Sequence, residues 1–175
     1  MRTKNLFSLF LMMMLVVSSL SISCKSDDDG GGGGSAAAGT ISAKVDGSQF
    51  NSVEMATFAS INSGSIQIQG NTGGTSSKAI VMTIVGYDGV GTYPIGGGAN
   101  VFTVASYVET EVDLSNPTNP EVVTWSAPYD DSVAGEINIS EVTDTKVKGT
   151  FSFTAKAEGG STKTITEGSF NVNLQ

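Results

Sequence analysis

The stretch VKGTFSF, residues 147–153, decides the fold class. Its valine and its two phenylalanines alternate with polar residues, and one glycine, Gly149, stands between them. Alternation with a period of two is typical of a β-strand with one buried face. The same pattern occurs on either side, at residues 137–139 and 170–174. Short turn sequences at residues 143–145 and 158–160 separate the three runs. We therefore predict a three-stranded antiparallel meander joined by hairpins.

Further runs of this kind extend back to Thr40. In the second of them we expect Phe58 to anchor the strand in the core, and residues 80–85 are apolar enough to form a central strand. Residues 109–120 contain two prolines and are expected to form a long connecting loop. No stretch has a helical period. The prediction is an all-β domain over residues 40–175, an antiparallel β-sandwich or flattened barrel of about nine strands. The predicted runs before the meander are residues 41–45, 53–61, 66–68, 80–85, 101–108 and 121–126.

The composition excludes several kinds of chemistry. The chain has 175 residues, no histidine and one cysteine, with 17 acidic against 9 basic residues and a net charge of −8. The lack of histidine excludes an imidazole base or metal ligand and a Ser-His-Asp triad. A single cysteine excludes an intrachain disulfide and a cysteine-based zinc site. The acidic charge argues against nucleic acid as a partner.

Residues 1–23 have the features of a secretory signal peptide. Arg2 and Lys4 form a positive start, residues 6–17 are apolar apart from one serine, and small residues follow. The alternative is an uncleaved membrane anchor, but a bilayer-spanning helix needs about 20 apolar residues. We predict a cleaved signal, whose removal changes the net charge to −10 because Arg2 and Lys4 leave with it.

The residues around Cys24 carry a more specific signal. Leu20 and a small residue, Ser23, precede the cysteine, and this arrangement resembles a bacterial lipoprotein signal. The resemblance implies that the Cys24 thiol is lipidated, by palmitate among other chains, and that Cys24 begins the mature chain. The alternative is a secreted protein with a free thiol, although an odd cysteine in such a protein needs an explanation. Two or more acyl chains give stable membrane anchoring.

An acidic run follows the cysteine directly. The sequence Lys25, Ser26, Asp27, Asp28, Asp29 resembles the export signal that places Bacteroidetes lipoproteins on the outer face of the outer membrane. The alternatives are a solvated charge run and a lipoprotein on the periplasmic face. Residues 30–39 are glycine-rich and are expected to serve as a flexible tether. The second segment, residues 24–39, thus comprises the lipidated cysteine, the acidic run and the tether.

Several motifs in the remainder occur together in one family. The chain resembles an uncharacterised β-rich domain family common in Bacteroidetes lipoproteins. The resemblance implies a fold and a location, and it implies no chemistry. The motifs that carry it are residues 41–47 with Phe50, 91–95, 135–139, 147–153 and 168–172.

Acidic and amide side chains suggest one weak metal site. If the strand continues, Glu109, Glu111 and Asp113 lie on one face, and Asn116 and Asn119 could add oxygen ligands. Ca²⁺ prefers such a set of carboxylate and carbonyl oxygens. The alternative is a solvated acidic face or loop, and no EF-hand spacing is present. No other cofactor is expected.

A second candidate site is a ligand-binding surface near Trp125. An aromatic pair, Trp125 and Tyr129, precedes two acids, Asp130 and Asp131, so the rings could stack on a sugar while the carboxylates accept its hydroxyl hydrogens. The alternative is that Trp125 lies in the core and the acids lie in a solvated loop. Paired carboxylates can also hydrolyse glycosides, but adjacent loop acids are poor candidates, and we expect no enzymatic activity.

The sequence therefore favours an outer-membrane lipoprotein facing the cell exterior, with a non-catalytic β-domain that binds a glycan or a protein. The alternative is a structural or accessory envelope lipoprotein in a larger complex. An exposed aromatic patch would favour the first function, and a long unpaired strand edge would favour the second.

Overall fold

The structure is a computed structural model that describes residues 35–98 and 102–175. The predicted signal peptide, Cys24 and the acidic run of residues 25–29 lie outside the described residues. Within the two described ranges, no helix is long and apolar enough to cross a membrane. The described strands and the hydrophobic core that they enclose lie within residues 40–174, so this segment has a core of its own, as a domain that folds alone requires.

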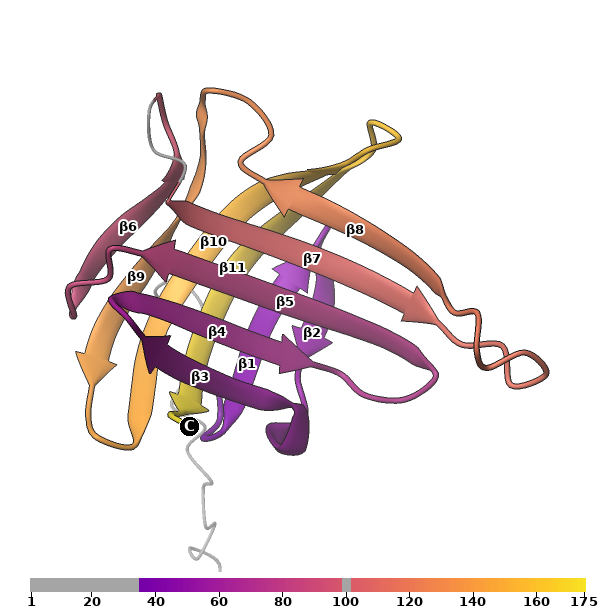
Figure 1. The fold of residues 1–175 in the computed structure, drawn as a ribbon, viewed down its shortest axis with the longest axis horizontal. Helices are drawn as coiled ribbons and strands as arrows, with labels where there is room; N and C mark the ends of the chain where they lie inside the picture. The colour runs from indigo at the N-terminus through magenta and orange to yellow at the C-terminus, as the bar shows by residue number, and fades with distance from the viewer. Residues whose placement is uncertain (1–34, 99–101) are drawn as a thin grey trace, which may run out of the picture. The chain divides into compact units, whose positions relative to one another are not determined.

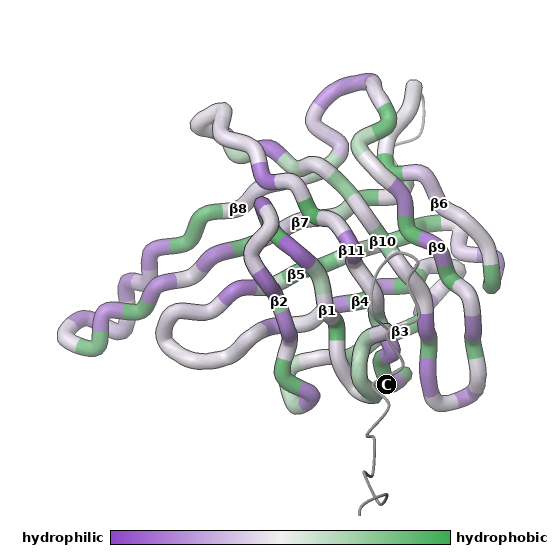
Figure 2. Tube along the Cα trace, turned by 180° about the vertical axis from the view of Figure 1, so that it is seen from behind, coloured by the Kyte–Doolittle hydropathy of each residue, from purple (hydrophilic) through white to green (hydrophobic). Residues whose placement is uncertain are grey.

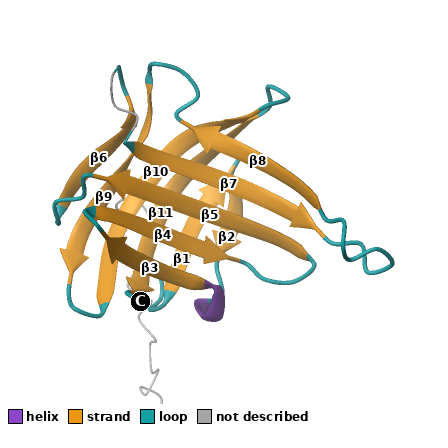
Figure 3. Cartoon of the chain, viewed as in Figure 1, coloured by secondary structure: helices purple, strands orange, loops and turns teal. Residues whose placement is uncertain are grey.

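The described chain forms eleven β-strands and one short 3₁₀ turn, η1 (Glu54–Ala56). The all-β prediction is confirmed (Figure 3). Two strands were not predicted, because β2 is only four residues long and β6 is interrupted by glycine and proline. The strands are β1 (Thr40–Val45), β2 (Ser48–Asn51), β3 (Thr57–Asn62), β4 (Ser65–Asn71), β5 (Ser76–Val85), β6 (Gly91–Gly96), β7 (Thr103–Glu111), β8 (Glu121–Ala127), β9 (Val133–Val142), β10 (Lys146–Ala157) and β11 (Thr162–Asn173).

All the strands belong to one curled antiparallel sheet. The main order is β2-β1-β11-β10-β8-β7-β5-β4-β3, and β9 pairs with both β10 and β6. Figure 1 shows β3, β4, β5, β7 and β8 crossing in front of β1, β2, β10 and β11, so the curled sheet resembles a sandwich. Because the sheet curls, the edge strand β3 meets the end of the chain just after β11: Ala59 of β3 forms a parallel bridge with Leu174.

The core fills the space between the two layers. Strand β5 contributes Ile80, Met82 and Ile84 from one face, while Val85 on its other face is exposed. Strand β10 alternates in the same way along its whole length. Fully burying an Ile or Phe side chain contributes about 1.5–3 kcal/mol to stability. The largest fully buried side chains are those of Tyr107, Phe50 and Phe170, with eight isoleucines and Met82.

The predicted C-terminal meander is confirmed. Strand β10 pairs with β9 on one side and with β11 on the other, so that Phe151 lies opposite Ile137 and Gly149 lies opposite Phe170. A Cβ atom at Gly149 would overlap the Asn138 carbonyl oxygen and the ring of Phe170. Glycine is therefore required there for close packing within the strand.

The predicted role of Phe58 is wrong. Residues 54–56 form η1, so β3 begins only at Thr57 and its inner face carries Thr57 and Ala59. The Thr57 hydroxyl donates to the Val53 carbonyl oxygen at 2.7 Å, across η1. Phe58 consequently lies on the outer face and is partly exposed.

Candidate functional site

A hollow of about 90 Å³ opens where the apolar core ends between the two layers. One side is formed by β5 and β7, and the other by the β1–β2 hairpin and β11. Phe50 and Tyr107, both fully buried, lie beneath charged and polar groups. We call Asp46, Lys78, Tyr107, Glu109 and Lys163 the open end of the sheet. Ser48, Gln49 and Val45 complete its lining.

The open end holds a hydrogen-bonded and ion-paired network. The Tyr107 hydroxyl donates to Glu109 Oε1 at 2.8 Å, and the same oxygen lies 3.8 Å from Lys163 Nζ. Lys163 Nζ also lies 3.2 Å from Asp46 Oδ2. The Asp46 carboxylate accepts a further hydrogen bond from the Thr164 amide at 2.9 Å. The network thus joins β7 in one layer to β11 and the β1–β2 turn in the other.

The electrostatics fix the protonation of two groups in this network. Burial raises the pKa of the Tyr107 hydroxyl well above its usual value, and the hydrogen bond to Glu109 and the negative charges of Glu109 and Asp46 raise it further. The Thr164 amide, aided by the Lys163 ammonium, lowers the pKa of Asp46 against the opposing effect of desolvation. At neutral pH, Tyr107 is therefore a neutral donor and Asp46 an anion.

The two lysines of the open end differ in their surroundings. Lys163 is three-quarters buried, and its ammonium lies 5.3 Å from the centre of the Trp125 ring, a cation–π contact. Lys78 lines the same hollow and is exposed. The four ion pairs between described residues do not include Lys78. The Lys78 ammonium is therefore the more available of the two for a ligand.

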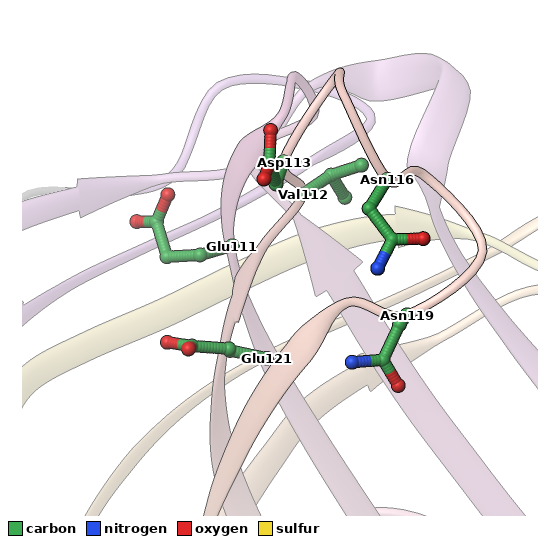
Figure 4. Close-up of a pocket in the computed structure, with 6 residues that line it drawn as sticks. All are labelled: Glu111, Val112, Asp113, Asn116, Asn119 and Glu121. Carbon is green, nitrogen blue, oxygen red and sulfur yellow. The ribbon is translucent and has the colours of Figure 1, made fainter.

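The residues predicted for Ca²⁺ separate into two places. Glu111, Asp113, Asn116 and Asn119 line a second, more open hollow of about 420 Å³, to which Glu121 also contributes (Figure 4). Glu109 lies apart from them because it contacts Tyr107 and Lys163.

The side chains around this second hollow do not converge on one point. Figure 4 shows the Glu111 and Glu121 carboxylates on one side of the hairpin and the Asn116 and Asn119 amides on the other. Asp113 instead accepts hydrogen bonds from the Ser115 amide and hydroxyl, both at 2.8 Å, which lower its pKa. Among the residues that the structure describes, no three His, Cys, Asp or Glu side chains are arranged to hold a metal. The Ca²⁺ site stays a prediction.

The aromatic residues predicted for ligand binding are not brought together on the surface. Trp125 is only 6% exposed, and it packs on Tyr107 with ring centres 5.7 Å apart. Tyr129 is 42% exposed and lies beyond the Ala127–Pro128 bond, near Lys156. Trp125 therefore belongs to the core, as the alternative interpretation held.

The two acids that follow Tyr129 shape a loop. Asp130 accepts hydrogen bonds from the amide and hydroxyl of Ser132, which lower its pKa. The Asp131 carbonyl oxygen accepts from the Gly98 amide at 2.8 Å. Both side chains are exposed and could contact a ligand. The buried Trp125 ring, however, could not contact the same ligand together with them.

Sequence reasoning missed most of the open end. Asp46 resembles an ordinary turn residue because Gly47 follows it, and Lys163 resembles a solvated lysine because it stands in no motif. The alternation of buried and exposed residues along a strand could have indicated the two lysines of the open end. Lys78 stands two residues before the buried Ile80, and Lys163 two before the buried Ile165. Polar residues that continue an apolar face at the end of a strand mark the border of a core.

Fold and site together define an all-β protein with one curled antiparallel sheet and a polar open end. Residues 37–172 match the family described as a domain of unknown function, DUF6252, and the chain belongs to that family. No curated protein and no solved structure matches the chain.

Proposed function

We propose that this chain is a lipoprotein of the outer membrane, anchored through Cys24 and displayed at the cell exterior, whose β-domain is a non-catalytic binding module. The resemblance of residues 20–24 to a lipoprotein signal supports the anchor, and the acidic run of residues 25–29 supports the display. The likeness to β-rich domains of Bacteroidetes lipoproteins supports both. This part of the proposal rests on the sequence.

The observation that carries the binding role is the charged network at the open end. Two ammonium groups, from Lys78 and Lys163, lie beside two carboxylates, from Asp46 and Glu109, around one hollow. A sugar hydroxyl both donates and accepts hydrogen bonds, so neighbouring anions and cations can serve it together. The open end therefore suits the hydroxyl groups of a glycan, or a polar side chain of a protein ligand.

The protonation of the acids supports binding over catalysis. A general acid at neutral pH needs a raised carboxyl pKa. The resolved shifts of carboxyl pKa values, at Asp46, Asp113 and Asp130, are all downward. Carboxylates that stay ionised act as hydrogen-bond acceptors, which is the role a binding site requires of them.

A glycan array probed with residues 35–175 tests the module. We expect some glycans to bind, and we expect Lys163→Met and Glu109→Gln to lose them. Glu136→Gln is the matched control, because Glu136 is exposed on β9 and lies outside the open end. If no glycan binds, or if the two variants bind as the unaltered domain does, the glycan-binding role of the open end is wrong.

One observation also favours the second candidate function, that of an accessory component in a larger complex. Part of β8 has an unpaired edge, since it pairs with β10 only through Trp125 and Ser126. Unpaired strand edges are common sites of protein association.

A further inference from the structure

The first half of β8 presents a free strand edge. Residues 121–127 pair with β7 over their whole length, but on the other side only Trp125 and Ser126 pair, with Ala157 and Lys156 of β10. All four residues from Glu121 to Thr124 are exposed, including Val122 at 55% and Val123 at 46%. We call residues 121–124 the free edge of β8. Figure 1 shows it as the outer side of the projecting β7–β8 hairpin.

The other edges of the described sheet are blocked by devices that discourage pairing. Strand β2 has four residues, and β6 carries Pro94, which has no amide hydrogen to donate. The edge of β3 is covered at Ala59 by the C-terminus, where the Gln175 amide donates to the Ala59 carbonyl oxygen at 2.9 Å. Short strands, prolines and covering segments are the usual means of protecting an edge. The free edge of β8 is as short as β2 and follows Pro120, but it contains no proline and no described strand pairs with it on this side, and its sequence, EVVT, favours a strand.

The charge around this edge indicates what can pair with it. Between Lys78 and Lys146 the chain has ten acidic residues and no basic residue. Three of these acids, Glu111, Asp113 and Glu121, surround the hollow at the base of the β7–β8 loop. Figure 2 shows hydrophilic and hydrophobic segments interspersed along this hairpin. A strand placed here meets backbone donors and acceptors, two exposed valines and a field of negative charge.

We propose that the free edge of β8 is the docking site for an extended, positively charged segment of a protein partner, which adds a strand to the sheet. Backbone hydrogen bonds to β8 supply affinity, and a Lys or Arg at the end of the incoming strand meets Glu111, Asp113 and Glu121. A second copy of this chain is a poorer occupant, because pairing two β8 edges brings two acidic hairpins together. This proposal does not rest on glycan binding at the open end.

Two short peptides test the edge and its charge preference. Fluorescence anisotropy at low salt compares the peptide KVTVTK with EVTVTE, each added to residues 35–175. We expect KVTVTK to bind at least tenfold more tightly and to weaken as salt is added. Equal affinity for the two peptides, or no binding of KVTVTK, would overturn the proposal.

Proline substitutions separate edge pairing from general charge attraction. Neighbouring residues in a strand direct their amides to opposite sides, so one of Val122 and Val123 donates toward β7 and the other donates outward. We therefore expect one of Val122→Pro and Val123→Pro to keep nearly the original melting temperature and to lose KVTVTK binding. If the stable proline variant binds the peptide as before, the attraction is only electrostatic and the proposal fails.

Matched charge variants complete the test. We expect Glu121→Gln to weaken KVTVTK binding two- to fivefold, and Glu136→Gln to leave it unchanged. A weakening by Asp46→Asn as large as that by Glu121→Gln would place the peptide at the open end instead. Sedimentation velocity tests whether a second copy of the chain occupies this edge instead. If the unaltered domain is a dimer and the stable proline variant is a monomer, a second copy binds the edge and the proposal is overturned.

Discussion

The ammonium of Lys163, on the last strand, lies 3.2 Å from Oδ2 of Asp46, in the turn after the first strand. Lys163 also lies over the Trp125 ring and within 3.8 Å of Glu109. One partly buried cation therefore holds together a turn, the end of β7 and the aromatic residues beneath the open end. Because Asp46 is nearly half exposed, this contact contributes more to the arrangement of the site than to global stability.

The lowered pKa of Asp46 predicts a pH-dependent effect of Asp46→Asn. The folded-state pKa lies below the ordinary value of 3.8, so the anion stabilises the fold above that value. This stabilisation is lost as pH falls through the folded-state pKa. Melting temperatures of both proteins between pH 7 and pH 2 measure it. We expect the unaltered protein to melt higher at pH 7 and the two curves to converge in acid. A difference that stays constant with pH would contradict the assignment.

The buried hydroxyl of Tyr107 predicts a second stability effect. Tyr107→Phe removes the hydrogen bond to Glu109 and leaves the ring in place. We expect a loss of about 1 kcal/mol in the free energy of unfolding. The lost hydrogen bond is to a charged group, but the Glu109 carboxylate can be partly hydrated in its place. Tyr129→Phe is the matched control, since Tyr129 is 42% exposed, and it should change stability by less than about 0.5 kcal/mol. Urea unfolding measures both, and equal effects would contradict the role given to the hydroxyl.

The alternation of apolar and polar residues with a period of two is enough to predict most of the fold. Residues such as Ile80, Met82 and Ile84 show the buried face directly, and nine of the eleven described strands follow from such runs. The period fails where a strand is too short to show it, as in β2, or contains Gly and Pro, as in β6. Phe58 was misplaced because η1 shifts the start of β3, and a single 3₁₀ turn leaves no periodic signal.

The candidate site was harder to predict because it depends on contacts across the two layers. Lys163 and Asp46 are separated by more than a hundred residues, and only the curled sheet brings them together. The predicted aromatic pair is separated for a related reason. Trp125 and Tyr129 are close in sequence, but the inner face of β8 takes Trp125 into the core, where it packs on Tyr107.

The close packing at Gly149 predicts a large effect of a small change. Gly149→Ala places a methyl group where the Asn138 carbonyl oxygen and the Phe170 ring already lie. We expect a loss of about 1–3 kcal/mol in the free energy of unfolding, as in other overpacked cores. Gly159→Ala is the control, because a Cβ there meets nothing within 4 Å. Urea unfolding measures the stability of the two variants. If Gly149→Ala is as stable as the control, the close packing around Gly149 is contradicted.

The proposed anchor predicts two separable effects of changes before the domain. Cys24→Ala removes the thiol that we propose carries the acyl chains, so labelled palmitate should no longer be incorporated and the protein should leave the membrane fraction. Changing Asp27, Asp28 and Asp29 together to Ala should leave palmitate incorporation intact. The same change should, however, protect the domain from protease added to intact cells, because the proposed export signal is lost. If the unaltered protein is itself protected while the cells stay intact, the domain faces the periplasm, and its partners belong to the envelope instead of the surroundings.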